Sequence, residues 1–253
     1  MEIPTYPYDH EYLGRERELY IDRLFRKRLS KHLDRIVTFS NDETIFGCPT
    51  IRISNGIDFN SIPLRSLPTN RKENEIHLIA VAEIHFWHGF DRLIHGLGKY
   101  YQTNPTTQVY LHLVGEFFGA REKEEILTPI KTYGLEKYVI CYGNQSGEAL
   151  NNIFNQCDFA IGSLARHRSG ITHIKTLKNR EYAARGFGFI YSETDDDFEQ
   201  MPYILKVPAD ETPIDIPKLI TFCQSLSHSP KEIRDSIQHL SWKEQMKQVI
   251  SSL

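Results

Sequence analysis

The sequence predicts an α/β protein built on a doubly wound, parallel, Rossmann-like sheet, and three observations support this prediction. From residue 76 onward, short apolar segments alternate with longer amphipathic ones, which is the pattern of repeated strand–helix units. Two of the apolar segments end directly at a glycine, Gly115 and Gly143. Segment 178–190 runs from charged residues through small ones and Gly186 into an apolar stretch, as a helix does when it enters a buried parallel strand.

The repeating part can be divided by periodicity and by its turn residues. The expected strands are Ile76–Val81, Gln108–Val114, Tyr138–Tyr142, Asp158–Ile161, Phe187–Ser192 and an edge strand Tyr203–Val207. The expected helices are Phe90–Tyr101, Arg121–Tyr133, Glu148–Cys157, Thr176–Arg185, Ile216–Leu226 and Pro230–Leu253. Ligands of such sheets bind beyond the carboxyl ends of the strands, which points to loops 82–89, 115–120, 143–147 and 162–175.

The first 75 residues do not follow this repeat. Residues 1–10 are rich in proline and tyrosine and are not expected to be helical. A charged amphipathic helix is expected over Glu11–His32, followed by strands Ile36–Ser40 and Thr50–Ser54. Residues 58–75 contain Pro63 and Pro68 and few apolar side chains, so they are expected to be a linker.

Composition excludes several classes of protein. The 253 residues are 40% hydrophobic and 25% charged, which is typical of a globular protein, and the net charge of −3 gives no sign of a nucleic-acid partner. The sequence has no apolar stretch of about 20 residues for a membrane span. Its four cysteines are far apart in the sequence, which indicates reduced thiols and a cytoplasmic protein.

Segment 176–190 also carries the strongest chemical signal. Lys178 and Glu181 are three residues apart and share one face of the expected helix. If this helix begins near Thr176, that face lies in its first turns, where free backbone N–H groups can hold an anion. A cation for a phosphate beside a carboxylate for a sugar hydroxyl suggests a nucleotide-sugar site.

Several segments, in this order, resemble family-4 glycosyltransferases of the GT-B fold, in particular those of bacterial polysaccharide biosynthesis. Segment 53–58 is similar to their interdomain segment, segment 81–94 to the first strand and helix of their C-terminal domain, and segment 178–190 to the end of their Glu-x7-Glu motif. The segments that resemble their second, third and fourth strands are 112–116, 134–143 and 155–161, and residues 2–8 resemble a loop of their N-terminal domain.

The resemblance implies a division of the chain and an activity. Residues 1–57 would form part of an acceptor-side domain, 58–75 a linker, 76–215 the donor-nucleotide-binding domain and 216–253 C-terminal helices. The implied activity is retaining transfer of a hexose from a UDP- or GDP-linked donor, without a cofactor or bound metal, to a polysaccharide such as capsule or to a lipid-linked glycan. The implied location is the cytoplasm, including the inner face of the membrane. Most of the acceptor-side domain would then be missing, which leaves three alternatives: a truncated chain, a fragment from a late start codon, or half of a two-chain enzyme whose partner chain supplies the missing domain.

The resemblance assigns roles to individual residues. His173 would lie beside the transferred sugar, and the donor-binding residues would be Lys178, Glu181, Arg168, His88, Thr176, Gly143 and Asn144. The sequence departs from the family at Glu83 and His88, where an arginine and a lysine usually bind the donor diphosphate, and at His173, where the family has a glutamate. His88 can still donate a hydrogen bond to a phosphate, more strongly if it is protonated.

Each assignment has a structural alternative. Lys178, Glu181 and Arg168 can equally be solvated surface charges, and His173 can be a loop residue that caps a backbone group. The run Asp195–Asp197 is expected to be a solvated loop and no metal site. The basic face of the helix over 11–32 either contacts a lipid-linked acceptor at a membrane or is simply solvated.

Two other functions compete with a complete glycosyltransferase. One is a non-catalytic nucleotide-binding subunit, or half of a two-chain enzyme, which the residues at Glu83, His88 and His173 favour. The other is an unrelated Rossmann-like sugar-nucleotide enzyme such as an epimerase. The absence of a GxGxxG loop and of a Tyr-x-x-x-Lys pair argues against the epimerase.

Overall fold

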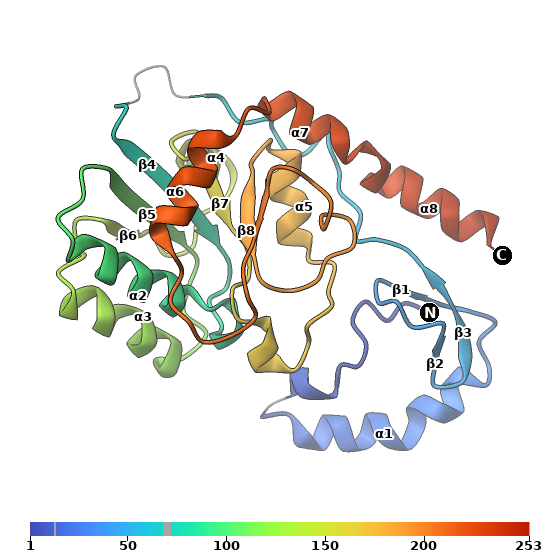
Figure 1. Cartoon of the computed structure of the whole chain (residues 1–253). Helices are drawn as coiled ribbons and strands as arrows, with labels where there is room; N and C mark the ends of the chain where they lie inside the picture. Colours follow the sequence, from blue (N-terminus) through green and yellow to red (C-terminus); the bar gives the residue numbers. More distant parts are fainter. Residues whose placement is uncertain (13, 68–71, 253) are drawn as a thin grey trace.

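A six-stranded sheet, parallel throughout, forms the centre of the protein (Figure 1). The computed structural model describes residues 1–12, 14–67 and 72–252. The strands lie in the order β6-β5-β4-β7-β8-β9. Their bounds are β4 (Glu75–Val81), β5 (Gln108–Val114), β6 (Val139–Cys141), β7 (Phe159–Ile161), β8 (Phe189–Tyr191) and β9 (Ile204–Lys206). The expected α/β fold with a parallel sheet is confirmed.

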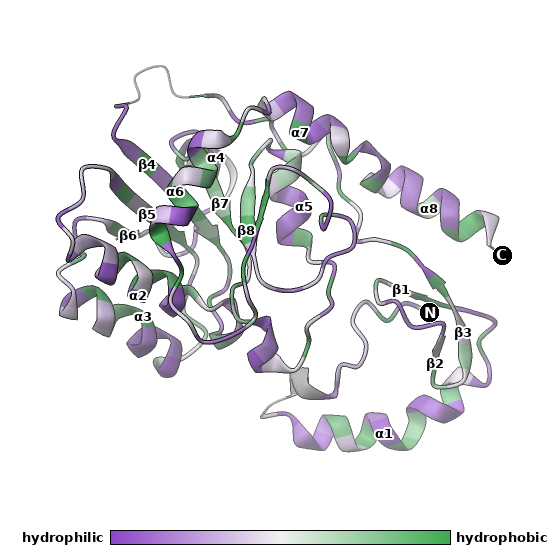
Figure 2. Ribbon diagram, viewed as in Figure 1, coloured by the Kyte–Doolittle hydropathy of each residue, from purple (hydrophilic) through white to green (hydrophobic). Residues whose placement is uncertain are grey.

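Helices cover both faces of this sheet. One core contains Leu78 and Ala80 of β4, together with residues from α2 (Phe90–Tyr101), α3 (Ala120–Thr132) and α6 (Ile216–Ser225). The other contains Ile79, with residues from α4 (Gly147–Phe154), α5 (Leu177–Ala184) and α7 (Pro230–Ser236). Neighbouring residues of β4 point to opposite faces, so both faces are apolar, as the green strands of Figure 2 show. The sheet is therefore doubly wound.

The chain order of the strands reverses beside β4. Strands β5 and β6 are added on one side of β4, and β7, β8 and β9 on the other. A reversal of this kind creates the crevice in which ligands of open parallel sheets bind, beyond the carboxyl ends of the strands, here those of β4 and β7. The fold thus singles out loops 82–89 and 162–176.

These two loops are held together closely. The backbone N–H of Leu164 donates to the carbonyl of His88 at 2.8 Å. Gly89 has a φ of +63°, and a Cβ at this position would lie 2.6 Å from the Cβ of Ala165. Only glycine allows both this backbone conformation and this close approach.

A smaller unit precedes the main sheet. Its three strands are β1 (Ile36–Thr38), β2 (Thr44–Ile45) and β3 (Cys48–Arg52), in the order β1-β3-β2. The strand expected at 50–54 thus begins and ends two residues earlier, and β2 was not expected. The helix expected from Glu11 is wrong in its first turn. A 3-10 helix, η1 (Asp9–Tyr12), comes first, and Gly14 with φ of +81° separates it from α1 (Glu16–Ser30). Residue 13 lies outside the described residues.

The end of the chain packs back onto this smaller unit (Figure 1). The single helix expected over Pro230–Leu253 is instead three segments: α7, the 3-10 helix η4 (Gln238–Leu240) and α8 (Trp242–Ser251). The helix is interrupted before Ser241, because this residue is the N-cap of α8 and its hydroxyl accepts from the N–H of Glu244 at 3.3 Å. Val249 packs with Phe39 and Ile51 of the small unit. Leu253 and linker residues 68–71 lie outside the described part.

No helix among the described residues combines the length and the apolar character that a membrane span requires.

Candidate functional site

The crevice beside β4 receives the amino end of α5. Thr176 caps this helix, with its hydroxyl accepting from the N–H of Asn179 at 3.5 Å. The helix therefore begins where the sequence predicts, at Thr176. In its first turn, the ammonium of Lys178 donates to the hydroxyl of Ser163, just after β7, at 3.3 Å and lies 5.6 Å from the ring centre of Phe90 in α2. Lys178 thus points from α5 toward the carboxyl edge of the sheet.

A buried carboxylate balances part of this charge. Glu193 follows β8 and is only 1% exposed. Burial raises its pKa, and the nearby Lys178 ammonium partly offsets that effect. Burial also lowers the pKa of Lys178; Glu193 opposes this effect, whereas Arg166 adds to it. Within the described structure one carboxylate oxygen of Glu193 has no hydrogen-bond partner, so the site holds spare acceptor capacity. Glu193 could not be assigned from the sequence, because it lies 15 residues from Lys178 in a polar loop that carries no motif.

His88 forms another wall of the same region and is neutral. Its Nδ1 accepts from the backbone N–H of His85 at 3.0 Å, and its ring stacks on Phe90 with centres 5.4 Å apart. Burial holds the pKa of His88 well below its ordinary value, and the charges of Lys178 and Arg166 lower it further. Near pH 7 the ring therefore offers one donor, Nε2–H, and the stronger, protonated donor considered from the sequence does not form.

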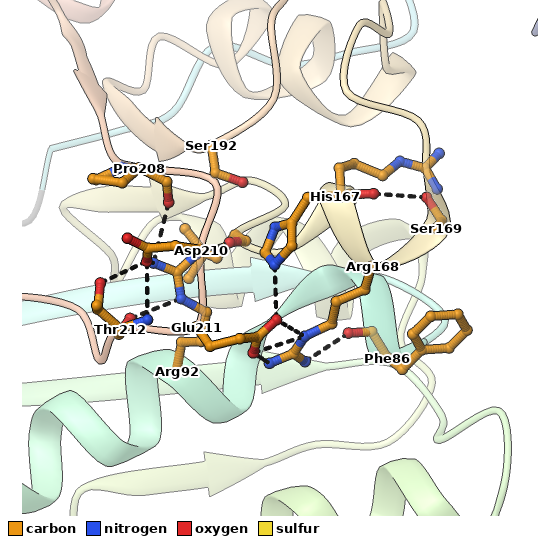
Figure 3. Close-up of polar contacts among 12 residues, drawn as sticks. Phe86, Arg92, His167, Arg168, Ser169, Ser192, Pro208, Asp210, Glu211 and Thr212 are labelled. Carbon is orange, nitrogen blue, oxygen red and sulfur yellow. Dashed lines mark hydrogen bonds and ion pairs between the residues drawn. The ribbon is translucent and has the colours of Figure 1, made fainter.

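Arg168 is fully engaged with protein groups (Figure 3). Its guanidinium forms ion pairs with Asp91 at 2.8 Å and with Glu211, and it donates to the carbonyl of Phe86 at 2.9 Å. Burial works against its charge, but these two carboxylates outweigh burial and raise the pKa of Arg168. Every N–H-bearing nitrogen of the group is used. A phosphate contact would require one of these pairs to break, so binding by Arg168 stays a prediction.

Glu181 lies one turn along α5 and is about one third exposed. It pairs with Arg185, one turn further on, at 2.9 Å. Arg185 in turn donates to the side chain of Asn151 in α4 at 2.8 Å and covers the ring of Phe154. The carboxylate is therefore accessible and held in a fixed position, and its role toward a ribose remains a prediction.

His173 lies at the junction of the two units. Its Nε2 lies 2.8 Å from a carboxylate oxygen of Asp196 and 3.1 Å from the side-chain nitrogen of Asn41, which belongs to the small unit. Burial alone would raise the pKa of Asp196, but hydrogen bonds from Asn41 and His173 outweigh burial and hold this pKa below its usual value. His173 thus joins the two units through side-chain contacts, and its place beside a transferred sugar remains a prediction.

A cavity of about 230 Å³ lies beside this junction. His173, Thr176 and Arg166 line it from the main unit, and Tyr6, Phe39 and Asn55 from the small unit. Among the described residues that line it, neither Lys178 nor Glu181 appears. A hollow of about 1000 Å³ lies between α2, α3 and Arg168, but most of its lining residues belong to these two helices and none to the end of a strand. We therefore place the candidate site at the smaller cavity and the adjoining crevice.

Gly143 and Asn144 lie further away, after the edge strand β6. Gly143 has φ of +65°, and the N–H of Asn144 donates to the carboxylate of Glu116 at 3.2 Å. Two strands separate them from the crevice, since β6 is followed by β5 and then β4. The contact of Gly143 and Asn144 with the base of a donor nucleotide therefore remains a prediction.

The acidic run Asp195–Asp197, which follows β8, was expected to be a solvated loop, and the structure shows that Asp195 and Asp197 are mostly buried. Asp195 is completely buried and pairs with the equally buried Arg180 of α5 at 2.7 Å. Asp197 pairs with the same guanidinium and accepts from the hydroxyl of Ser54 at 2.6 Å. The run is therefore a structural clamp that joins α5 to the small unit. Arg180 lies two residues from Lys178, so it faces the opposite side of α5, and this spacing was the signal available in the sequence.

Comparison with known proteins supports the fold. No protein-family model matches the chain, and no curated protein matches it either. Among solved structures, sucrose-phosphate synthase from Thermosynechococcus elongatus is similar, with a TM-score of 0.67, 17% identity, and coverage of 90% of this chain and 60% of that protein. The structure of Anabaena Alr3699/HepE in complex with UDP and glucose is also similar, with a TM-score of 0.66 and 19% identity. That match covers 90% of this chain and 66% of the Anabaena protein.

The C-terminal domain of a group 1 glycosyltransferase, LpcC from Francisella tularensis, is also similar. Its TM-score is 0.53 at 15% identity, and the match covers 72% of this chain and 96% of that domain. At these identities the likeness shows the fold, which is that of GT-B glycosyltransferases. This chain spans about 60% of the synthase.

Proposed function

We propose that this chain is the donor-binding half of a retaining glycosyltransferase. It would hold a UDP- or GDP-linked hexose for transfer to a polysaccharide or lipid-linked glycan in the cytoplasm or at the inner membrane face. The observation that carries the proposal is the amino end of α5, with Lys178 in its first turn, at the crevice where the strand order reverses. The bound UDP and glucose of a structure with the same fold support it.

The chemistry proposed for the site is electrostatic. Negative charge grows on the departing diphosphate as the bond to the sugar breaks. Free N–H groups at the start of α5 and the Lys178 ammonium would stabilise that charge, and the neutral His88 would add one hydrogen bond. A phosphate beside Lys178 also favours its charged form, which burial alone disfavours. Because the family's arginine and lysine are replaced by Glu83 and His88, Lys178 would supply the principal cation.

The remaining residues would orient the donor. Glu181 would accept from the ribose hydroxyls, and Thr176 and His173, both on the cavity wall, would approach the diphosphate and the sugar. Gly143 and Asn144 would lie near the base. Arg168 would contribute by fixing the loop after β7, and would contact phosphate only after releasing Asp91 or Glu211.

Calorimetric titration with UDP, GDP and their hexose conjugates tests this proposal. Lys178→Ala should weaken binding of the preferred nucleotide about tenfold or more, because a charge-assisted contact to phosphate is lost. Glu181→Ala should weaken it by a similar factor. Lys137→Ala is the control, because Lys137 is exposed and precedes β6 at the opposite end of the sheet. Unchanged affinity in both site variants would refute the assignment.

A second function differs only in catalysis. The chain would bind nucleotide as a non-catalytic subunit, or complete its active site with a partner chain that supplies the rest of an acceptor-side domain. Glu83, which is exposed and pairs with His85 at 3.1 Å, favours this reading, since a carboxylate repels a diphosphate. Donor hydrolysis by the isolated chain separates the two: turnover supports an enzyme, and binding without turnover supports the subunit.

A further inference from the structure

Three aromatic side chains, Trp87, His85 and Phe118, form a stacked group beyond the carboxyl ends of β4 and β5, which we call the aromatic column. The rings of Trp87 and His85 are nearly parallel, with centres 4.2 Å apart and an angle of 9° between their planes. The ring of Phe118 also packs on that of His85, with centres 4.3 Å apart. His85 therefore joins the other two rings, and Phe118, which is 65% exposed, forms the outer end of the column.

The two loops that carry the column are paired with each other. Ile84 and Phe117 form a parallel β-bridge. The N–H of Ile84 donates to the carbonyl of Glu116 at 2.8 Å, and the N–H of Phe118 donates to the carbonyl of Ile84 at 3.0 Å. A single exposed phenylalanine on a flexible loop needs no explanation, but the backbone of Phe118 is held in place. A ligand that covers this ring therefore has little loop ordering to offset.

The inner end of the column meets the candidate site. The guanidinium of Arg166 lies 5.3 Å from the ring centre of Trp87. Arg166 also lines the cavity of about 230 Å³ between the two units. The column therefore extends from the wall of this cavity to the molecular surface at Phe118.

Two exposed carboxylates lie beside the column. The side chain of Glu83 is 67% exposed, and one of its oxygens accepts from Nε2–H of His85 at 3.1 Å. Glu116 is exposed too, and its carboxylate accepts from the N–H of Asn144 at 3.2 Å. Ionised carboxylates only accept hydrogen bonds, and they repel anions. A neutral ligand rich in hydroxyl groups is therefore favoured here over a nucleotide or an anionic lipid.

We propose that the aromatic column is a binding subsite for a neutral glycan. A pyranose ring carries weakly positive C–H groups on its faces, and these pack on the negative face of an aromatic ring such as that of Phe118. Its hydroxyl groups lie around the rim, where Glu83 can accept from them. That this glycan is the acceptor, held by a sugar unit remote from the transfer, rests on the proposed function, whereas glycan binding itself does not.

Charge argues against a second copy of this chain as the occupant. A symmetric contact through Phe118 would bring Glu83 and Glu116 of one copy close to the same residues of the other, and like charges at an interface are unfavourable. A glycan covers the exposed ring and supplies hydrogen-bond donors to the carboxylates together.

Saturation-transfer difference NMR with cellotetraose tests this inference. The equatorial substituents of this tetrasaccharide leave both faces of each ring open for stacking, so its C–H protons should receive saturation from the protein. Phe118→Ala should weaken binding about tenfold, because the stacked contact is lost. Phe118→Trp should retain binding, because it restores an aromatic face. Glu83→Ala should weaken binding about fivefold through the loss of one hydrogen bond.

Matched variants separate the column from general effects of apolar surface and charge. Phe25→Ala removes a similarly exposed ring from α1, and Glu136→Ala removes an exposed carboxylate that precedes β6. Both controls should bind cellotetraose as the unchanged chain does.

Three outcomes would overturn the inference: no saturation transfer at millimolar cellotetraose, unaltered binding in Phe118→Ala, or self-association that Phe118→Ala abolishes without any saccharide binding. Nucleotide titration of Phe118→Ala should match that of the unchanged chain, which also shows that the variant is folded. Nucleotide binding without glycan binding would refute the subsite alone, and glycan binding without nucleotide binding would refute the donor site alone.

Discussion

Asp195 and Asp196 are adjacent in the sequence but lie in opposite environments. Asp195 is completely buried against Arg180, whereas the side chain of Asp196 is 44% exposed and bonds to His173 across the junction of the units. Burial raises the pKa of Asp195, and Arg180 partly offsets this rise. One residue of a charged run thus holds α5 in place, while its neighbour joins the two units through His173 and Asn41.

This difference predicts different costs for the same substitution. Asp195→Asn should lower the free energy of unfolding by about 3 kcal/mol, because a neutral amide no longer balances the buried positive charge of Arg180. Asp196→Asn should lower it by less than about 1 kcal/mol, since an exposed ion pair contributes little. Urea denaturation at pH 7 measures both. Equal effects would mean that Arg180 and Asp195 are not a buried pair.

Individual pairings explain which site residues the sequence could assign. The pairing of Glu181 with Arg185 follows from their spacing of four and is visible in the sequence. The pairing of Arg168 with Glu211 spans 43 residues and depends on how the loop after β9 returns to α2. Local spacing therefore predicts the start of α5 and its charged face, but not which charges are already neutralised by distant partners.

At the scale of elements, the two loops at the strand reversal act as one structure. His88 and Leu164 share a backbone hydrogen bond, and Gly89 passes against Ala165. The buried Arg92 of α2 adds a donor to the carbonyl of Leu164 and another to that of Thr212 at 2.8 Å. The two loops that would receive the donor are therefore tied to each other by backbone and side-chain contacts.

Comparison of Gly89 with Gly134 distinguishes the effect of backbone conformation on stability from the effect of close packing. Gly89 and Gly134 have nearly the same φ, +63° and +64°, but a Cβ at Gly134 would meet nothing within 4 Å. Gly134→Ala should therefore cost only the strain of the left-handed conformation, about 1 kcal/mol. Gly89→Ala should cost about 2 kcal/mol more, because the added methyl group also collides with Ala165. Thermal denaturation of the two variants checks this, and equal losses would contradict the close approach.

The elements of the main sheet were predictable because each carries its own periodicity and turn residues. Elements that depend on distant contacts were not. Strand β2 has only two residues and forms through its pairing with β3. The break between α7 and α8 occurs where Ser241 forms a β-bridge with Ile57. In both places the deciding contact comes from a segment elsewhere in the chain.

At the scale of the whole molecule, the small unit and the main sheet are joined at one side of the candidate cavity. The joining contacts come from three separate parts of the main unit. Asp197 binds Ser54, His173 and Asp196 meet Asn41, and α8 packs on Phe39 through Val249. A Cβ at Gly56 would lie 2.3 Å from the ring of Trp242 in α8, so the chain between the units also passes tightly under this helix. A ligand in the cavity would touch both units.

The measurement that tests the central claim most directly is hydrogen exchange of the whole chain with and without a saturating nucleotide diphosphate, UDP or GDP as titration selects. The account predicts slower exchange in segments 82–92 and 162–181, which form the crevice and the start of α5, with α1 unchanged. Protection confined to the groove between α2 and α3, or no protection with either nucleotide at millimolar concentration, would contradict it.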